Sequence, residues 1–360
     1  MTNTIEIVDW DFLADTIEDE KCVLFLGPGI AVNEAGKSLQ SAFFEELYQQ
    51  NQTAILSYHK QDGFLLFNDQ STKMRLIYRI KKFYKEIFAQ ELLEKIIKIP
   101  FHLIVSVTPD LSLQKIAEQN NIPADFFFYD RRTRQDLKVK PSASKPLIYN
   151  MFGSITNDET LIVTHNDLFE YLKAVFGEIK LPDELRMNIA QAKQFIFLGF
   201  EFDKWYFLLL LSLLNLNDER FVRYASTQEL NNEVKALCEK HFRINFVSKN
   251  INNFVNKIYD MFQAKDGLRK PAGMPVSRGN YILSNIRELL NEMFNSESLT
   301  VFCQDYYWDI YNQFSDEMTK TKKIALLIDY VKRNNTIKEL LNRLKEIDED
   351  CFFLHQPYFE

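Results

Sequence analysis

The amino-acid sequence predicts an α/β protein with a doubly wound, mostly parallel sheet, followed by a small all-helical bundle. Short, uninterrupted apolar runs recur through the larger, N-terminal part of the chain, as expected of strands buried on both faces of a sheet. Amphipathic helical patterns separate these runs, and such alternation is typical of parallel sheets. After about residue 280 only helical spacing occurs, so a separate helical bundle is expected there.

The first expected strand, 22–26, is the apolar run CVLFL, which ends at a glycine. The further expected strands are 103–107, 147–149, 161–163, 195–198 and 244–247. The expected helices between them are 43–48, 73–97, 168–175 and 252–262. The most apolar run, 205–214, has ten residues, about half of a membrane span, and we expect it to form a buried helix.

Glycine and proline usage divides the chain. We expect an α/β domain over residues 1–264 with a helical insertion around 40–100, a linker over 265–279, and a helical domain over 280–360. The residues that indicate the linker are Gly267, Pro271, Gly273, Pro275 and Gly279.

The composition excludes several functional classes. The 43 basic and 50 acidic residues give a net charge of −7, without the basic excess of a protein that binds nucleic acid. The four cysteines lack C-x-x-C spacing and the five histidines lack paired ligand spacing, so neither a metal site nor a disulfide framework is expected. The acidic N-terminal segment MTNTIEIVDWDF does not resemble a signal peptide, and we expect a cytoplasmic protein that does not bind membranes.

A glycine-containing loop follows the first expected strand in LFLGPGIAVNEAG. Gly27 and Gly29 lack side chains, so backbone amides there can approach a pyrophosphate. A tight turn from strand to helix, with no ligand, explains the same pattern. The loop alone therefore leaves both interpretations open.

Four segments, taken together, resemble the sirtuin-like family. They are GPGIA at 27–31, SVTPD at 106–110, IYNMFGSI at 148–155 and LGFEFDKWYFLLLL at 198–211. They occur in the family's order and cover about residues 15–262, with Pro28 and Ala31 departing from the family's usual Gly-Ala-Gly-Ile-Ser. In the last segment, Asp203 and Trp205 match bacterial sirtuin-like defence proteins.

The resemblance implies a Rossmann-like sheet that binds NAD or an ADP-ribose-type nucleotide at the loops after its strands, without a metal. The positions that align with the family's nucleotide-binding segments are Gly27, Pro28, Gly29, Ile30, Thr108, Asp110, Gly153, Ser154, Gly199 and Asp203. For Asp203, capping of a helix is an alternative to contact with a ribose.

Two positions lack the polar groups that the family uses to cleave the nicotinamide glycosidic bond. Thr108 stands in place of the family's asparagine, and Phe152 in place of its histidine. A phenyl ring cannot accept a proton. We therefore expect a catalytically degenerate sensor or adaptor of a bacterial antiphage system, with no confident catalytic residue.

Two alternatives stay open. The first is an NAD glycohydrolase with unconventional active-site residues, activated on assembly or infection, in which Asn150 or His102 replaces the missing histidine. His102 begins its strand and so is expected to lie about 13 Å from the ligand end. The second is a structural subunit whose pocket is filled by its own side chains.

The C-terminal segment, about 281–352, resembles the effector-associated domains of bacterial conflict systems, which are small death-like helical bundles. The similarity includes the aromatic run FCQDYYWDIY and the final LLNRL. It implies contacts with other defence proteins and a homo-oligomer, whereas a cap on the α/β domain is the alternative. Thr336 and Glu339 have the spacing of a capping box, which would begin the last helix.

Overall fold

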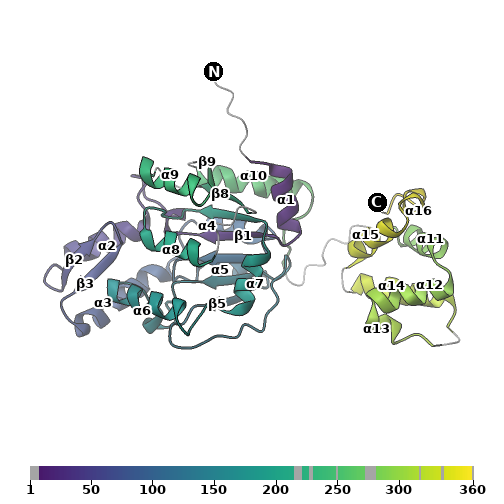
Figure 1. Cartoon of the computed structure of the whole chain (residues 1–360), viewed down its shortest axis with the longest axis horizontal. Coiled ribbons are helices and arrows are strands. Elements are labelled where there is room, and N and C mark those ends of the chain that lie inside the picture. Colours follow the sequence, from purple (N-terminus) through teal and green to yellow (C-terminus); the bar gives the residue numbers. More distant parts are fainter. Residues whose placement is uncertain are drawn as a thin grey trace, which may run out of the picture. The chain divides into compact units, whose positions relative to one another are not determined.

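The computed structural model describes residues 8–214, 221–226, 230–248, 250–271, 281–315, 318–333 and 336–358. The chain divides into two compact units, residues 1–273 and 274–360, each with its own apolar core (Figure 1). The first unit is built on a sheet, and the second is entirely helical over its described residues.

A seven-stranded parallel sheet forms the centre of the first unit, in the order β5-β6-β4-β1-β7-β8-β9. The strands are β1 (Cys22–Leu26), β4 (Leu103–Ser106), β5 (Asp125–Phe128), β6 (Leu147–Asn150), β7 (Gln194–Leu198), β8 (Val222–Ser226) and β9 (Ile244–Ser248). The expected fold class, a doubly wound parallel sheet followed by helices, is confirmed.

Helices cover both faces of the sheet because the side chains of β1 alternate between two apolar layers. Val23 and Phe25 enter one layer, while Cys22, Leu24 and Leu26 enter the other. The first layer is completed by α6 (His165–Phe176), α7 (Asp183–Gln191), α8 (Trp205–Leu213) and α9 (Asn232–Lys240). The second is completed by α1 (Trp10–Glu18), α4 (Gln90–Lys98), α5 (Ser112–Gln119) and α10 (Ile251–Ala264).

The insertion between β1 and β4 is not purely helical, which corrects the sequence-based expectation for residues 40–100. It contains α2 (Leu39–Gln50), the antiparallel hairpin of β2 (Ile55–His59) and β3 (Phe64–Phe67), and α3 (Gln70–Lys85). The hairpin reverses at Gly63, whose φ of 81° favours glycine. The pair Asp62-Gly63 is a turn signal that the helical interpretation did not use.

The helix expected over 73–97 is two helices, α3 and α4. The chain is extended at Glu86 and left-handed at Ala89, with φ of 52°, before α4 begins. No glycine or proline marks this break, and apolar residues on both sides continue at helical spacing.

The strand expected at 161–163 is wrong. This segment follows a short 3-10 helix, η2 (Asp158–Thr160), and pairs with no strand among the described residues. Its backbone is held at one point, where the Leu65 N–H donates to the Val163 carbonyl oxygen over 2.9 Å. Its apolar side chains, Leu161 and Val163, pack with the insertion instead.

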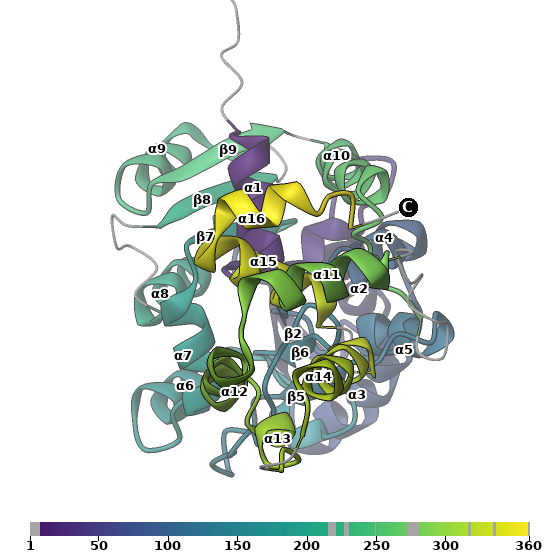
Figure 2. The same ribbon diagram turned by 90° about the vertical axis from the view of Figure 1, so that its right-hand side faces the viewer.

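The second unit comprises α11 (Leu283–Met293), α12 (Ser296–Tyr306), α13 (Trp308–Tyr311), α14 (Lys320–Arg333), α15 (Ile337–Ile347) and α16 (Glu349–Leu354). Figure 2 shows these helices, with α12 and α14 seen nearly end-on. Leu289, Leu299, Leu327 and Leu340 are fully buried in the shared core.

The capping box expected at Thr336 does not form. Thr336 precedes α15 with φ of −107° and ψ of 20°, outside the extended conformation that usually directs a capping side chain toward the first turn. Among the described residues its hydroxyl has no hydrogen-bond partner.

Part of the expected linker packs on the first unit. Arg269 is buried, and its guanidinium donates to the carbonyl oxygen of Phe101 over 2.7 Å and to that of Ile97. Residues 265–271 therefore extend the first unit, whereas 272–279 lie outside the described residues. Within the described part of the chain, no helix is both long and apolar enough to cross a membrane.

Candidate functional site

The sheet reverses its strand order between β1 and β7. The chain leaves β1 toward β4 on one side and leaves β7 toward β8 on the other. In open α/β sheets, ligands bind beyond the carboxyl ends of strands at such a switch point. In this sheet, the loops at the switch point are 27–30 and 199–203.

The glycines of these two loops pack against one another. The backbone N–H of Gly27 donates to the Leu198 carbonyl oxygen over 2.9 Å, and that of Gly29 donates to the Gly199 carbonyl oxygen over 2.8 Å. Gly199 has φ of 63°, and a Cβ added to it would lie 2.2 Å from the nitrogen of Ile30. Close contact between loops thus requires these glycines, and both amides are already hydrogen-bonded within the protein.

The polar residues after β4 satisfy one another. The Thr108 hydroxyl lies 2.8 Å from the Ser106 hydroxyl and donates to Asp110 Oδ2 over 2.5 Å. The other oxygen of Asp110 accepts the backbone N–H of Ser112 over 2.8 Å, at the start of α5. Asn150, at the end of β6, donates to the Asp110 carbonyl oxygen over 2.7 Å.

Phe152, two residues after β6, lies in the apolar core and is 7% exposed. Its ring stacks on Phe207, with centroids 5.5 Å apart, and meets Tyr171 edge-on at 5.1 Å. The next residue, Gly153, has φ of 81°, and a Cβ there would lie 2.3 Å from the Thr160 carbonyl oxygen. This packing directs the phenyl ring into the protein.

Ser154 completes this turn. Its backbone N–H donates to the Thr160 hydroxyl over 3.0 Å, and its own hydroxyl lies 2.9 Å from that of Thr156. Both polar groups of Ser154 are therefore hydrogen-bonded within the segment that ends in η2.

The hairpin of the insertion covers the aromatic cluster around Phe152. Lys204 is buried, and its ammonium donates to the Gln61 carbonyl oxygen over 2.7 Å, within the hairpin turn. The Tyr206 hydroxyl donates to the Asp62 carbonyl oxygen over 2.9 Å. Phe64, from β3, lies 5.3 Å from the Tyr206 ring. Side chains of the protein therefore fill the space beside Phe152.

Comparison with protein-family models identifies two domains in this chain. The model of the SIR2-like domain matches residues 103–247, and that of effector-associated domain 7 matches residues 286–347. The chain carries a SIR2-like domain and a C-terminal effector-associated domain. No protein with a curated description matches the sequence. The matched SIR2-like segment contains Thr108 and Phe152, and the glycine loop at 27–30 precedes it.

Neither polar side chain proposed to rescue activity lies free beside Phe152 in the SIR2-like domain. Asn150 is bound to Asp110, as described above. His102 precedes β4 at the amino edge of the sheet, where burial lowers its pKa from 6.5 to about 4 and Lys21 contributes in the same direction. It is therefore neutral at pH 7 and lies at the opposite edge from the loops.

The surroundings of β7 differ in part from the sequence interpretation. Asp203 is exposed and does not cap α8, whose N-cap residue is Lys204. Trp205, expected in the core, is 44% exposed, whereas Tyr206 and Phe207 are buried.

Lys37, which follows the glycine loop, pairs with Glu45, and Lys60 pairs with the same carboxylate. These contacts lower the pKa of the Glu45 carboxyl to about 2.

The cavity beside the glycine loop has a volume of about 50 Å³. Pro28, Ile30, Thr108 and Asp110 are among its lining residues. SIR2-like domains are NAD-related, and NAD is a dinucleotide. Pockets that hold small-molecule ligands have volumes on the order of 300–1,000 Å³. With the amides of the glycine loop already engaged, this conformation does not fit a dinucleotide.

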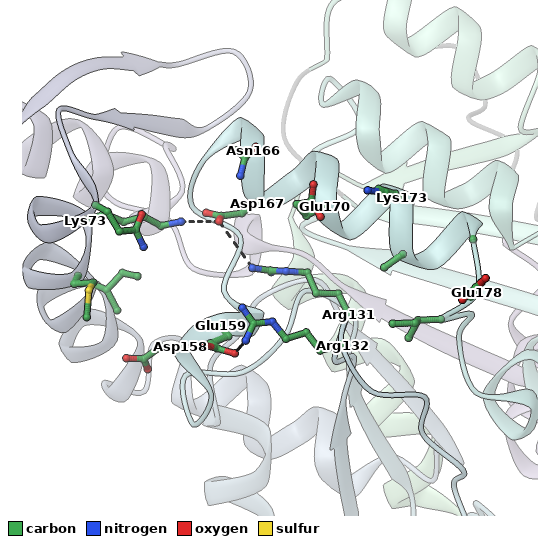
Figure 3. A pocket seen from close by; sticks show the side chains of 16 residues that line it. Lys73, Arg131, Arg132, Asp158, Glu159, Asn166, Asp167, Glu170, Lys173 and Glu178 are labelled. Carbon is green, nitrogen blue, oxygen red and sulfur yellow. Dashed lines mark hydrogen bonds and ion pairs between the residues drawn. The ribbon is translucent and has the colours of Figure 1, made fainter.

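A much larger cavity, of about 940 Å³, lies between α3, the loop after β5, and α6 (Figure 3). Lys73, Arg131 and Asp167 lie at its centre. The sequence interpretation missed this site because its residues come from an insertion helix and two separate segments. The available signal was the pair Arg131-Arg132, which follows the end of β5 after two intervening residues, Tyr129 and Asp130. No cluster of metal-ligating side chains occurs in the described ranges.

Proposed function

We propose that the chain is a catalytically degenerate sensor or adaptor of a bacterial antiphage system. A SIR2-like domain joined to an effector-associated domain suggests a defence-system effector or sensor. In this proposal the SIR2-like domain responds to a bound signal, and the effector-associated domain recruits a partner that carries a related domain.

The packing of Phe152 is the observation that carries the proposal. Cleavage of a nicotinamide glycosidic bond develops positive charge on the ribose, and polar groups must position the reactants around it. At the position of the family's histidine, this protein has a phenyl ring in an aromatic cluster. At the position of its asparagine, the Thr108 hydroxyl is committed to Asp110.

Exposed aromatic side chains support a recruiting role for the effector-associated domain. Tyr306 ends α12 and Trp308 begins α13, and both side chains are more than half exposed. Aromatic residues are enriched in protein interfaces. We propose contacts with other defence proteins and with further copies of the chain, in the cytoplasm. Free thiols at all four cysteines are consistent with that compartment.

The filled space beside Phe152 supports a second candidate, a structural subunit that binds no nucleotide. The side chains that fill it are Phe64, Tyr171, Lys204, Tyr206 and Phe207. This candidate differs from the sensor in one measurable property, because a subunit without a ligand site releases no heat on titration with small molecules.

The decisive experiment measures NAD loss by the purified full chain, alone and with lysate from infected cells. We expect no loss above that of the lysate. Turnover that is abolished by Thr108→Ala would overturn the proposal in favour of an NAD glycohydrolase. Calorimetric titration with NAD, ADP-ribose and ADP then separates the sensor, which binds one of them, from the structural subunit.

A further inference from the structure

The cavity between α3 and α6 has the dimensions of a ligand site. Its volume of about 940 Å³ lies near the upper end of the range for small-molecule pockets, on the order of 300–1,000 Å³. One wall is α3, which contributes Met74 and Ile77, and the opposite wall is α6 with Glu170 and Lys173. The loop after β5 supplies Arg131 from below α6 (Figure 3).

Most charges around this cavity are neutralised in pairs. Lys73 reaches Asp167 over 2.6 Å, and Arg132 pairs with Glu159. Asp167 is buried, and its second oxygen accepts both the backbone N–H and the hydroxyl of Thr164, at 3.0 and 2.8 Å. The Asp167 carboxylate therefore has several close partners other than Arg131.

Among the charged side chains of the cavity that are mostly buried, Arg131 is the exception. Its side chain is 14% exposed, and its only ion pair among the described residues joins Nη2 to Asp167 over a long 3.9 Å. Its Nη1 atom is buried and has no hydrogen-bond partner in the part of the chain that the structure describes. Burial lowers the pKa of this guanidinium, against the opposing effect of Asp167. A buried donor without a partner is costly, so the guanidinium is incompletely satisfied, and the exposed part of the same side chain lines the cavity.

We propose that this cavity binds a phosphorylated small molecule of the nucleotide class, with its phosphate at Arg131. The planar guanidinium matches the geometry of a phosphate, and Lys73 lies on the far side of Asp167 to add positive charge. The acidic Glu170 accepts hydroxyl or amino groups, which nucleotides carry beside their phosphates. Met74 and Ile77 provide apolar surface for the ring.

This inference deepens the proposed function, since it places the signal of a sensor away from the switch point of the sheet. The two are tested separately. NAD turnover would refute the degenerate sensor and leave the binding result standing, whereas failure to bind here leaves the NAD assay unaffected.

The experiment is calorimetric titration of the full chain with ADP, with adenosine as the probe without phosphate and citrate as the anion without a nucleoside. We expect ADP to bind about tenfold or more tightly than adenosine and citrate. Arg131→Gln should weaken ADP binding by about tenfold or more. Arg134→Gln is the matched control, because Arg134 is exposed on the same loop and pairs with Asp183 instead. It should change ADP affinity less than about twofold.

Thermal unfolding separates a ligand-binding from a structural role of Arg131. Without ligand, Arg131→Gln should unfold at the same or a higher temperature, because it removes a buried, poorly paired charge. The stabilisation that ADP gives the wild type should be lost. The proposal is overturned by no heat from ADP, by equal ADP affinity in Arg131→Gln, or by citrate binding as tightly as ADP. A large fall in the unfolding temperature of the unliganded variant would equally assign Arg131 a structural role.

Discussion

The backbone N–H of Gly29 donates a 2.8 Å hydrogen bond to the carbonyl oxygen of Gly199. This bond joins the loops that follow the two central strands, β1 and β7, at the point where the strand order reverses. Elsewhere this position in a doubly wound sheet is left open for a ligand. Here the loops contact each other, so the same glycines that resemble a phosphate-binding loop close the site.

Replacement of Gly199 should test this closure. A Cβ at Gly199 would lie 2.2 Å from the Ile30 nitrogen, and the residue has φ of 63°. Gly199→Ala should therefore lower the free energy of unfolding by about 3 kcal/mol or more, measured by urea denaturation. Gly36 is the control, with φ of 76° but no atom within 4 Å of an added Cβ, so Gly36→Ala should cost only about 1–2 kcal/mol. Equal losses would show that the loops do not touch.

Truncation of Phe152 should destabilise the protein as strongly as the loss of a core side chain does. Because its ring is buried against Phe207 and Tyr171, Phe152→Ala should lower the free energy of unfolding by about 3–5 kcal/mol. Phe169→Ala is the matched control, since Phe169 is more than half exposed on α6 and should cost less than about 1 kcal/mol. A loss at Phe152 no larger than that at Phe169 would contradict the packing on which the proposed function depends.

The contact between Lys204 and the hairpin turn should control local opening. Lys204→Met removes the donor to the Gln61 carbonyl oxygen, so the turn should open more often. The amides of Asp62 and Gly63, both bonded to the His59 carbonyl oxygen, should exchange with deuterium about tenfold faster. Lys235→Met, at an exposed lysine on α9, should leave these rates unchanged. Unchanged exchange in Lys204→Met would mean that other contacts hold the turn.

The pH dependence of stability should carry a contribution from His102. Burial lowers its pKa from 6.5 to about 4, so between these values the unfolded chain binds the proton more readily than the folded protein. Protonation then favours unfolding, and the contribution to stability is lost as the pH falls from 6.5 to 4. The stability of the wild type relative to His102→Leu should fall by about 3 kcal/mol over this window. A pH-independent difference in denaturation free energy would contradict a buried, neutral imidazole.

Much of the sheet could be predicted because its central strands are apolar on both faces. The runs that form β1, β4, β6, β7 and β9 stand out from their surroundings. The short strands β5 and β8 were missed, since β5 is only half-buried at the sheet edge and β8 contains a charged residue, Arg223, that is buried in the fold. Periodicity over four or five residues cannot distinguish such segments from loops.

The candidate site was less predictable than the fold. The four segments that resemble sirtuin-like proteins were recognised, and the absence of an imidazole at Phe152 could be seen directly in the sequence. The hydrogen bonds that consume the Gly27 and Gly29 amides could not, because their partners, Leu198 and Gly199, lie about 170 residues away in the chain. The charged cavity around Arg131 likewise combines an insertion helix with a loop and a later helix.

The sequence by itself determined the fold class, the two-part organisation and the residue types at the aligned catalytic positions, since each depends on local composition and spacing. Only the tertiary structure decided which spaces are filled and which stay open. Side-chain packing and long-range hydrogen bonds closed the strand-end cleft with the protein's own residues, and the same folding left a partly unpaired arginine beside a cavity large enough for a ligand.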